Sequence, residues 1–228
     1  KGHNNFWQIY NDATLDDNWY VKTIRASNSG LLPADELMDA AKSMSEDQYL
    51  QEFECDFESA IVGAYWGREM RALTDMGRIT KVPYDPMFKV CTAWDLGRTD
   101  STSIWWWQMV HGEIRVLEHH SSNGHNVDYY TDLILSKGYG YSTHWLPHDA
   151  RAKTLASGGK SIIEQISNKI PLESLKIVPS LSLQDGIQAS RLALMRAWFD
   201  AEKCEDGIEC LRQYQREFDE DRKVFRDK

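Results

Sequence analysis

Residues 88–97, FKVCTAWDLG, are the most informative part of the sequence for the fold class. The first seven residues are mostly apolar, which is typical of a buried strand, and the run ends at Asp95 with a glycine two positions later. A carboxylate at the end of a strand faces solvent or a ligand while its backbone stays in the sheet. Gly97 allows a sharp turn or the close approach of another group. The alternative is an aspartate that only caps the following turn, and the residues leave both interpretations open.

Working outward, residues 103–110 predict a second strand, and His111-Gly112 predict a tight turn into a third strand at 114–118. Strands joined this closely must be antiparallel. Beyond them, helices and strands alternate. The further strands are expected at 143–147 and 175–178, and the helices at 127–136, 161–166, 184–199 and 208–218. This order predicts a mixed α/β sheet flanked by helices, and it resembles an RNase H-like fold.

The leading segment predicts a short α+β extension. Residues 19–24 alternate like a strand, Pro33 is expected to open a helix, and a second helix is expected from Ser45 to Glu54. Glycines and prolines then punctuate the chain, so a boundary is expected between about 60 and 85. We therefore predict an extension over 1–60, a linker over 61–87 and the main domain over 88–228. The beginning of the chain has no signal-peptide pattern and no initiator Met, as expected for a piece cut from a longer chain.

Composition excludes several classes of protein. Hydrophobic residues make up 42% of the 228 residues and charged residues 27%, which predicts an ordinary globular core. No apolar run approaches the length of about 18 residues that a membrane span needs. The net charge of −9 lies mainly in residues 1–60, while the rest is nearly neutral and neither favours nor forbids a polyanionic partner. The four cysteines form no CxxC pair, so reduced thiols are expected rather than a zinc site.

Asp149 follows the strand at 143–147 as Asp95 follows the strand at 88–94. If these two strands are neighbours, the carboxylates converge and repel each other unless a cation lies between them. Oxygen ligands of this kind suit Mg²⁺ or Mn²⁺, and such a pair can hold two ions roughly 3.5–4 Å apart for phosphodiester hydrolysis. The alternative is that Asp149 caps a helix starting near Ala150 and is neutralised by Arg151.

The loop Gly158-Gly159-Lys160-Ser161 does not fit a P-loop, because Thr154 stands where that motif needs glycine and no strand directly precedes it. A helix start at Ser161 is expected instead. Arg151, Lys153 and Lys160 bracket the loop close to Asp149 and would suit a DNA backbone. A solvated loop without a ligand is the other interpretation of these cations.

Other chemistry finds little support in the sequence. The run Trp105-Trp106-Trp107 could stack on bases, but sheet packing is the favoured interpretation. His144 and His148 lie on a strand interrupted by proline, and His119 and His120 point to opposite faces, so neither pair predicts zinc. No GxSxG motif or Cys-His pairing indicates nucleophilic catalysis.

Six segments of the sequence match one family in their order and spacing. They are 51–57 (QEFECDF), 63–66 (GAYW), 77–79 (GRI), 92–102 (TAWDLGRTDST), 148–150 (HDA) and 184–191 (QDGIQASR). Together they resemble the large terminase subunit of tailed bacteriophages, and in particular its C-terminal nuclease domain. The match covers nearly the whole chain, and its order and spacing are more specific than any one motif.

The resemblance implies a metal-dependent endonuclease that cuts concatemeric viral DNA during genome packaging. Asp95 and Asp149 match the family's first two metal ligands, with two Mg²⁺ or Mn²⁺ ions as cofactors. Residues 2–6 look like the stretch just after the ATPase coupling motif, so 1–60 would be the tail end of the ATPase domain, without Walker motifs and without ATPase activity. The implied partners are double-stranded DNA, the portal protein and the small terminase subunit. The implied location is the host cell cytoplasm, with no membrane contact and no place in the mature virion.

One departure from the family pattern leaves a rival hypothesis open. The family takes a third acidic ligand from a helix near its C-terminus in an Asp-Ala-apolar-Arg context, which does not occur in this sequence. Asp219, Asp221 and Asp227 do not match it, and the expected acid would follow Lys228. The alternative function is a catalytically incomplete module that binds DNA, portal or small subunit. Another RNase H-like nuclease, such as a resolvase, is less consistent with the leading segments.

Overall fold

The computed structural model describes residues 5–44, 46–57, 64–97, 100–153, 159–219 and 224–226. The chain divides into two compact units, one formed by Lys1–Asp75 with Glu209–Lys228 and the other by Met76–Ile208. Each unit is described by itself. Among the described helices, none combines the length and the apolar character required to cross a bilayer.

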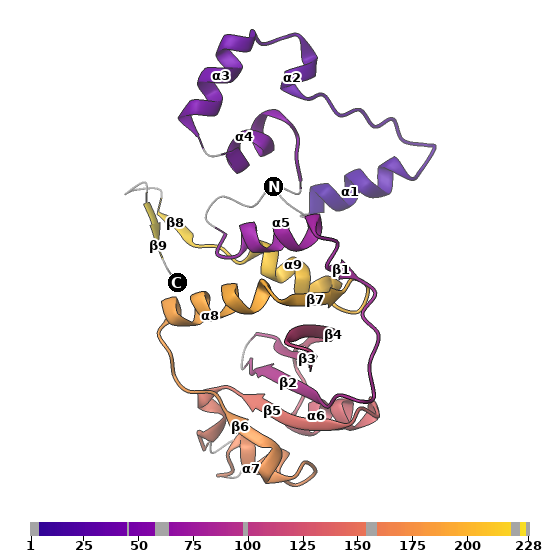
Figure 1. The fold of residues 1–228 in the computed structure, drawn as a ribbon, viewed down its shortest axis with the longest axis vertical. Helices are drawn as coiled ribbons and strands as arrows, with labels where there is room; N and C mark the ends of the chain where they lie inside the picture. Colours follow the sequence, from indigo (N-terminus) through magenta and orange to yellow (C-terminus); the bar gives the residue numbers. More distant parts are fainter. Residues whose placement is uncertain are drawn as a thin grey trace. The chain divides into compact units, whose positions relative to one another are not determined.

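The unit Met76–Ile208 is built on a seven-stranded mixed sheet in the order β1-β7-β4-β3-β2-β5-β6 (Figure 1). Strand β3 runs antiparallel to both of its neighbours, β2 and β4, and the remaining pairs are parallel. The predicted antiparallel trio and the predicted RNase H-like mixed α/β sheet are therefore confirmed. The strands are β1 (Ile79–Thr80), β2 (Val90–Asp95), β3 (Thr102–Val110), β4 (Glu113–Ser122), β5 (Tyr141–Leu146), β6 (Leu175–Ile177) and β7 (Ala197–Asp200).

The hairpin between β3 and β4 forms as the sequence predicts. His111 and Gly112 have φ values of 50° and 87°, so both central residues occupy the left-handed region. Two-residue turns of this kind match the right-handed twist of the flanking strands. Glycine adopts this conformation without strain, which explains its place in the turn.

Polar caps begin the helices that flank the sheet. Asn126 caps the predicted helix α6 (Val127–Ser136) by accepting a hydrogen bond from the Tyr129 backbone N–H. Ser161 begins α7 (Ile162–Ile166) through a reciprocal capping box with Glu164, which confirms the predicted helix start. The other elements are the 3₁₀ turns η1 (His148–Arg151) and η3 (Leu172–Ser174) and the helices α8 (Leu183–Leu194) and α9 (Glu205–Gln213).

The main core lies between one face of the sheet and helices α6 and α7. Trp106, in β3, is fully buried and packs in one cluster with Ile134 of α6 and Ile166 of α7. Its neighbours Trp105 and Trp107 are half-buried and alternate to the opposite face. The tryptophan run is therefore sheet packing, as the favoured interpretation held.

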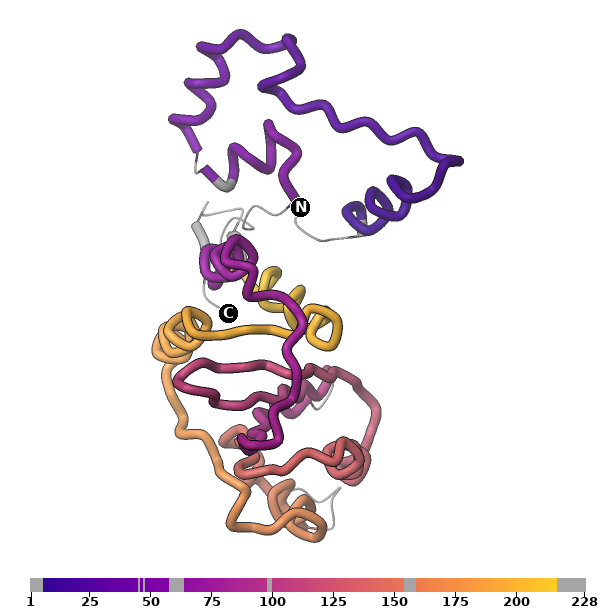
Figure 2. Tube along the Cα trace, turned by 45° about the vertical axis from the view of Figure 1, so that its right-hand side comes forward, coloured from indigo at the N-terminus to yellow at the C-terminus, as the bar shows by residue number. Residues whose placement is uncertain are grey.

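The predicted helix over 184–199 is wrong in its last part. Helix α8 ends at Leu194, and after a short turn the chain becomes β7, a change of direction that can be followed in Figure 2. Strand β7 pairs in parallel with β4 on one side and β1 on the other, and Phe199 is buried between them. A short apolar run suits a helix and a strand equally well, and these two partner strands decide the outcome.

The described residues of the other unit are mainly helical. Pro33 precedes α3 (Ala34–Ser43), whose first turn holds Asp35 and Glu36, so the predicted helix is confirmed. Ser45 lies outside the described residues. The other elements are α1 (Asn5–Thr14), α2 (Ala26–Ser29), α4 (Glu46–Phe53), α5 (Gly67–Asp75) and the antiparallel pair β8 (Glu217–Asp219) and β9 (Val224–Arg226).

The strand predicted at 19–24 is wrong, because within the described parts of the chain these residues join no sheet. Alternation alone does not make a strand where no neighbour supplies hydrogen bonds. The main sheet also begins inside the predicted linker, since Ile79 and Thr80 pair with β7. The division into 1–60, 61–87 and 88–228 remains a prediction.

Candidate metal and nucleic-acid site

The sheet places Asp95 and Asp149 at the same edge. Strands β2 and β5 are parallel neighbours, and Ala93 pairs with Trp145 in their register. Asp95 ends β2 two residues after Ala93, while Asp149 lies in the 3₁₀ turn η1 just beyond β5. The predicted adjacency of the two strands is therefore correct. Both carboxylates follow the carboxyl ends of parallel strands, where open α/β sheets bind ligands.

Two other carboxylates lie close enough to Asp95 to affect its pKa. Loss of surrounding water raises the pKa of Asp95, and the negative charges of Asp100 and Asp149 raise it further. A hydrogen bond involving the Leu96 backbone acts in the opposite direction. Three like charges near one strand end favour either a proton on Asp95 or a bound cation.

Gly97 explains how Asp100 comes close to the end of β2. A Cβ atom at Gly97 would lie 2.4 Å from the Asp100 carbonyl oxygen and 2.6 Å from the carbonyl of Ser101. Because backbone atoms occupy that space, a side chain here would displace the returning loop. Of the two predicted reasons for a glycine at position 97, the structure shows the close approach of another group, here the backbone of Asp100 and Ser101. Asp100 is not among the predicted site residues, although an acid shortly after a strand-ending Asp-x-Gly is an available signal in the sequence.

The donor chemistry fits a hard divalent cation, since carboxylate oxygens are the ligands that Mg²⁺ and Mn²⁺ prefer. The repulsion around Asp95 is what such an ion would relieve. The donor set is small, however. Within the described ranges, no three or more His, Cys, Asp or Glu side chains group closely enough to hold a metal ion.

The predicted cations lie on both sides of residues 154–158 in the sequence. Arg151 lies in η1 and is exposed, as is Lys160. Lys153 pairs with Ser161 in an isolated bridge, and its Nζ lies 3.4 Å from Glu164 Oε1. That ion pair is largely exposed, and exposed pairs contribute only about 0–1 kcal/mol, so a phosphate can compete for the lysine. Residues 154–158, including Gly158, lie outside the described residues.

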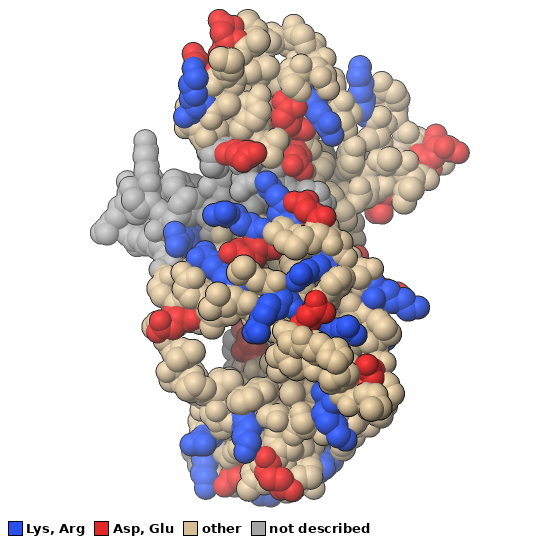
Figure 3. Space-filling view, viewed as in Figure 1, with Lys and Arg blue, Asp and Glu red and all other residues tan. Residues whose placement is uncertain are grey.

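Charge on the visible surface is mixed. Figure 3 shows Lys and Arg side chains interspersed with Asp and Glu rather than gathered into one basic face. This pattern agrees with the nearly neutral charge of residues 61–228.

His144, in β5, is a buried residue with a structural role. It is buried, and its Nδ1 lies 2.8 Å from Thr92 Oγ1, which also accepts a hydrogen bond from Trp94 Nε1 at 2.8 Å. Burial lowers the pKa of His144 to about 4. The side chain is therefore neutral near pH 7 and serves the interior rather than a ligand.

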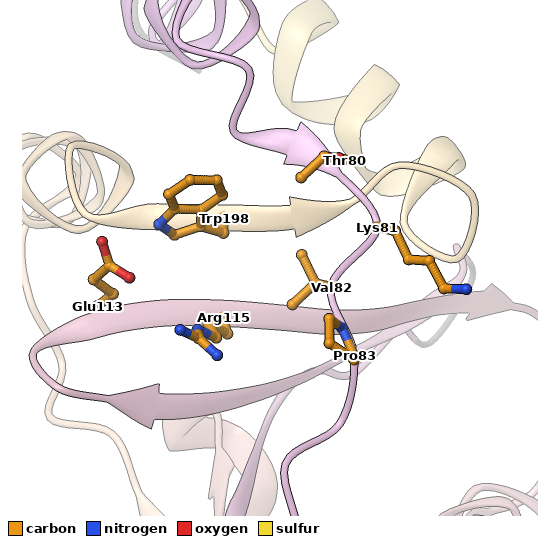
Figure 4. Close-up of a pocket in the computed structure, with 7 residues that line it drawn as sticks. All are labelled: Thr80, Lys81, Val82, Pro83, Glu113, Arg115 and Trp198. Carbon is orange, nitrogen blue, oxygen red and sulfur yellow. The ribbon is translucent and has the colours of Figure 1, made fainter.

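A pocket of about 200 Å³ lies at another part of the sheet, where β1, β4 and β7 meet (Figure 4). Trp198 Nε1 is buried there without a hydrogen-bond partner among the described residues, and the Arg78 guanidinium lies 5.3 Å from the centre of its ring. The lining contains none of the predicted site residues. It is formed by Thr80, Lys81, Val82, Pro83, Glu113, Arg115 and Trp198.

The sheet order, with β3 antiparallel between β2 and β4 and the other pairs parallel, defines an RNase H-like α/β fold. No family model matches the chain, and a search of curated proteins also finds no match. Solved structures do show similarity, and they point to large terminase nuclease domains.

A large terminase from a thermophilic bacteriophage, solved in several crystal forms, is 15% identical, with a TM-score of 0.52 over 95% of this chain and 53% of that chain. The present chain therefore spans about half the length of that protein. The nuclease domain of the P22 large terminase is 16% identical over 62% of this chain and 76% of its own, with a TM-score of 0.44. The nuclease of phage G20c large terminase, solved with bound cobalt, is 14% identical over 68% and 86%, with a TM-score of 0.43. At such identities the similarity establishes the fold and leaves the activity to be argued from the site.

Proposed function

We propose that this chain contains the metal-dependent endonuclease of a phage large terminase, which cuts concatemeric viral DNA during genome packaging. The observation that supports this most directly is the convergence of Asp95 and Asp149 beyond two parallel strands of an RNase H-like sheet. Asp95 and Asp149 would be the metal-ligating, catalytic carboxylates. Asp100 is a further oxygen donor within electrostatic reach of Asp95.

In this proposal each group has one task. Asp95 and Asp149 would hold two Mg²⁺ or Mn²⁺ ions, and the chemistry supplied by such ions would be activation of water and stabilisation of the leaving oxygen of the phosphodiester. Arg151, Lys153 and Lys160 bind the DNA backbone beside the cut and fix its position without reading its sequence. No group for binding or hydrolysing ATP is assigned to this chain.

The wider setting belongs to the same proposal. Residues 1–60 would complete the ATPase domain of a packaging motor, and 61–87 would connect it to the nuclease. The partners would be double-stranded DNA, the portal protein and the small terminase subunit, in the host cell cytoplasm. The fold supports the nuclease assignment, and these contacts follow only from the terminase setting.

Cleavage of supercoiled plasmid by the purified chain tests the nuclease directly. We expect nicked and linear products with Mn²⁺, none with EDTA, and at least a roughly 100-fold lower rate for Asp95→Ala and Asp149→Ala. Glu173→Ala, which removes an exposed carboxylate in η3, is the matched control and should cut normally. Cutting that survives in Asp95→Ala would disprove this assignment of the site.

The second candidate is a module that binds DNA, portal or small subunit without cutting. It is favoured by one observation, the small number of metal donors grouped in the described residues. A folded chain that shifts DNA in a gel but does not cut it in Mn²⁺ would support this alternative over the nuclease.

A further inference from the structure

The pocket of about 200 Å³ lies at the end of β4 that is away from Asp95. Glu113, the first residue of β4, stands opposite Val110. Asp95 stands opposite Ser103, and Ser103 pairs with Ser121 near the other end of β4. None of the groups proposed to hold metal or DNA lines the pocket. An inference about this pocket is therefore independent of the proposed nuclease.

Three polar side chains of the pocket have the chemistry to bind one another and do not. Trp198 and Arg115 pair in the register of β7 and β4, so they share one face of the sheet. Glu113 lies on the same face, two residues before Arg115. Trp198 Nε1 is buried without a partner among the described residues. Within the same parts of the chain, the half-buried side chains of Glu113 and Arg115 form no hydrogen bond or ion pair.

Such an arrangement is unusual in a folded protein. Buried polar groups are nearly always hydrogen-bonded, and a buried indole N–H normally finds an acceptor. Two donors and one acceptor that share a pocket without pairing are therefore arranged for a third polar group.

The charges that face the pocket balance. Figure 4 shows the Lys81 amine directed away from the other lining side chains, which leaves the Arg115 guanidinium and the Glu113 carboxylate. One cation and one anion favour a neutral ligand, because Glu113 would repel an anion. The guanidinium and the indole N–H only donate hydrogen bonds, and the carboxylate only accepts them. A matching ligand offers an acceptor to the first two groups and a donor to the third.

The apolar lining and the small volume restrict the rest of the ligand. Val82, Pro83 and the Trp198 ring supply the apolar walls. The Val82 N–H donates to Asp200 Oδ2 at 2.9 Å, and the Arg78 guanidinium lies 5.3 Å from the centre of the Trp198 ring, so both walls are held in place. Pockets for drug-sized ligands measure about 300–1,000 Å³, so this pocket suits a single small ring.

We propose that the pocket binds a compact neutral amide, in which a carbonyl and an N–H stand side by side on a small apolar body. The carbonyl accepts hydrogen bonds from Arg115 and from Trp198 Nε1, and the N–H donates to Glu113. Figure 4 shows the Glu113 carboxylate beside the indole nitrogen, and turning this carboxylate toward the ligand uncovers the indole N–H.

The test uses the indole N–H signals in the NMR spectrum of the ¹⁵N-labelled 228-residue chain, which has nine tryptophans. The signal that is lost in Trp198→Phe belongs to Trp198. The probe is 2-pyridone, a flat ring whose carbonyl and N–H are adjacent. We expect it to move the Trp198 signal downfield, because the indole N–H gains an acceptor, with a Kd on the order of 1 mM.

Two further probes separate the requirements of the pocket. N-methyl-2-pyridone keeps the ring and the carbonyl but lacks the N–H, so it should bind at least about 10-fold more weakly. Benzoate keeps a flat ring but carries a negative charge beside Glu113, so it should also bind about 10-fold more weakly than 2-pyridone.

Substitutions test the assigned partners. Glu113→Ala and Arg115→Ala should each weaken the binding of 2-pyridone about 10-fold, because each change leaves part of the ligand without a partner. Glu173→Ala, which removes an exposed carboxylate in η3, is the matched control and should bind the probe as the parent does. The other indole signals show whether a variant has kept its fold.

Three results would overturn the inference. The Trp198 signal could stay in place at the highest 2-pyridone concentration, N-methyl-2-pyridone could bind as well as 2-pyridone, or benzoate could bind more tightly than either, which would make the pocket an anion site. None of these results bears on the proposed nuclease, which plasmid cleavage tests separately.

Discussion

At the scale of single residues, the proposed function depends most on Asp95, the carboxylate at the end of β2. Asp95 is crowded by protein atoms and repelled by Asp100 and Asp149, and each effect raises its pKa. Such an arrangement is unfavourable for stability and favourable for cation binding. Functional sites are commonly destabilised in this way.

Replacing Asp95 should therefore stabilise the apo protein. Above its folded-state pKa, an acid whose pKa is raised lowers stability, because the folded state holds the charged form less well than the unfolded chain does. In EDTA near pH 7 we expect Asp95→Asn to raise Tm by about 1–3 °C. Mn²⁺ should raise the Tm of the parent but not of the variant. A lower Tm in EDTA would show that Asp95 has a stabilising partner.

His144, in the interior, predicts a separate dependence of the free energy of unfolding on pH. Its pKa of about 4 in the folded state lies below the usual value of 6.5, so the unfolded chain binds a proton more readily. Stability is then fully present above pH 6.5 and is lost as the pH falls toward 4, by up to about 3 kcal/mol. His144→Gln should flatten the dependence of urea unfolding on pH in this window. An unchanged slope would assign the acid sensitivity to other groups.

The two strand-end acids were predictable from sequence, because each follows an apolar run whose length fits a strand. Asp100 was not, since its closeness to Asp95 depends on the path of a loop that only Gly97 permits. A hydrophobic pattern does not carry that information.

At the scale of elements, β7 shows where local pattern fails. Residues 197–200 continue the apolar pattern of α8, so the sequence favours a longer helix. The structure instead inserts them between β1 and β4, where Ala197 and Phe199 are buried. Pairing with strands far away in the sequence overrides the local preference, and such partners are invisible to a single-sequence argument.

The packing of helix α9 against Trp105 and His119 can be tested at Gly207. Gly207→Ala would push a methyl group into the Trp105 and His119 rings, and we expect a loss of about 1–3 kcal/mol in the free energy of unfolding. Gly186→Ala in α8 is the matched control, since its added Cβ would meet nothing within 4 Å. That change should be neutral or stabilise by up to about 1 kcal/mol. Urea denaturation of the two variants distinguishes packing from helix propensity, and equal effects would contradict the packing account.

At the scale of the whole molecule, the net charge does not favour the binding of DNA. The chain carries 35 acidic and 26 basic side chains, so its overall field repels a polyanion. If the proposed function holds, DNA binding would have to come from the local cations near Asp149 and from a metal held by Asp95 and Asp149.

The salt dependence of DNA binding measures this local contribution. Arg151→Ala and Lys160→Ala should each reduce the slope of log K against log salt by about 1, as expected for one phosphate contact apiece. Lys176→Ala, at an exposed position in β6, is the control and should leave the slope unchanged. Equal slopes in all three variants would show that the loop after Asp149 does not touch the backbone.

Whether Asp95 and Asp149 hold a divalent metal can be seen in a crystal of the chain soaked in Mn²⁺, with anomalous diffraction recorded above the manganese absorption edge. We expect a peak between the Asp95 and Asp149 carboxylates that disappears in Asp95→Asn crystals. A Mn²⁺ peak elsewhere, with none beside these two carboxylates in fully soaked crystals, would show that they do not form the metal site.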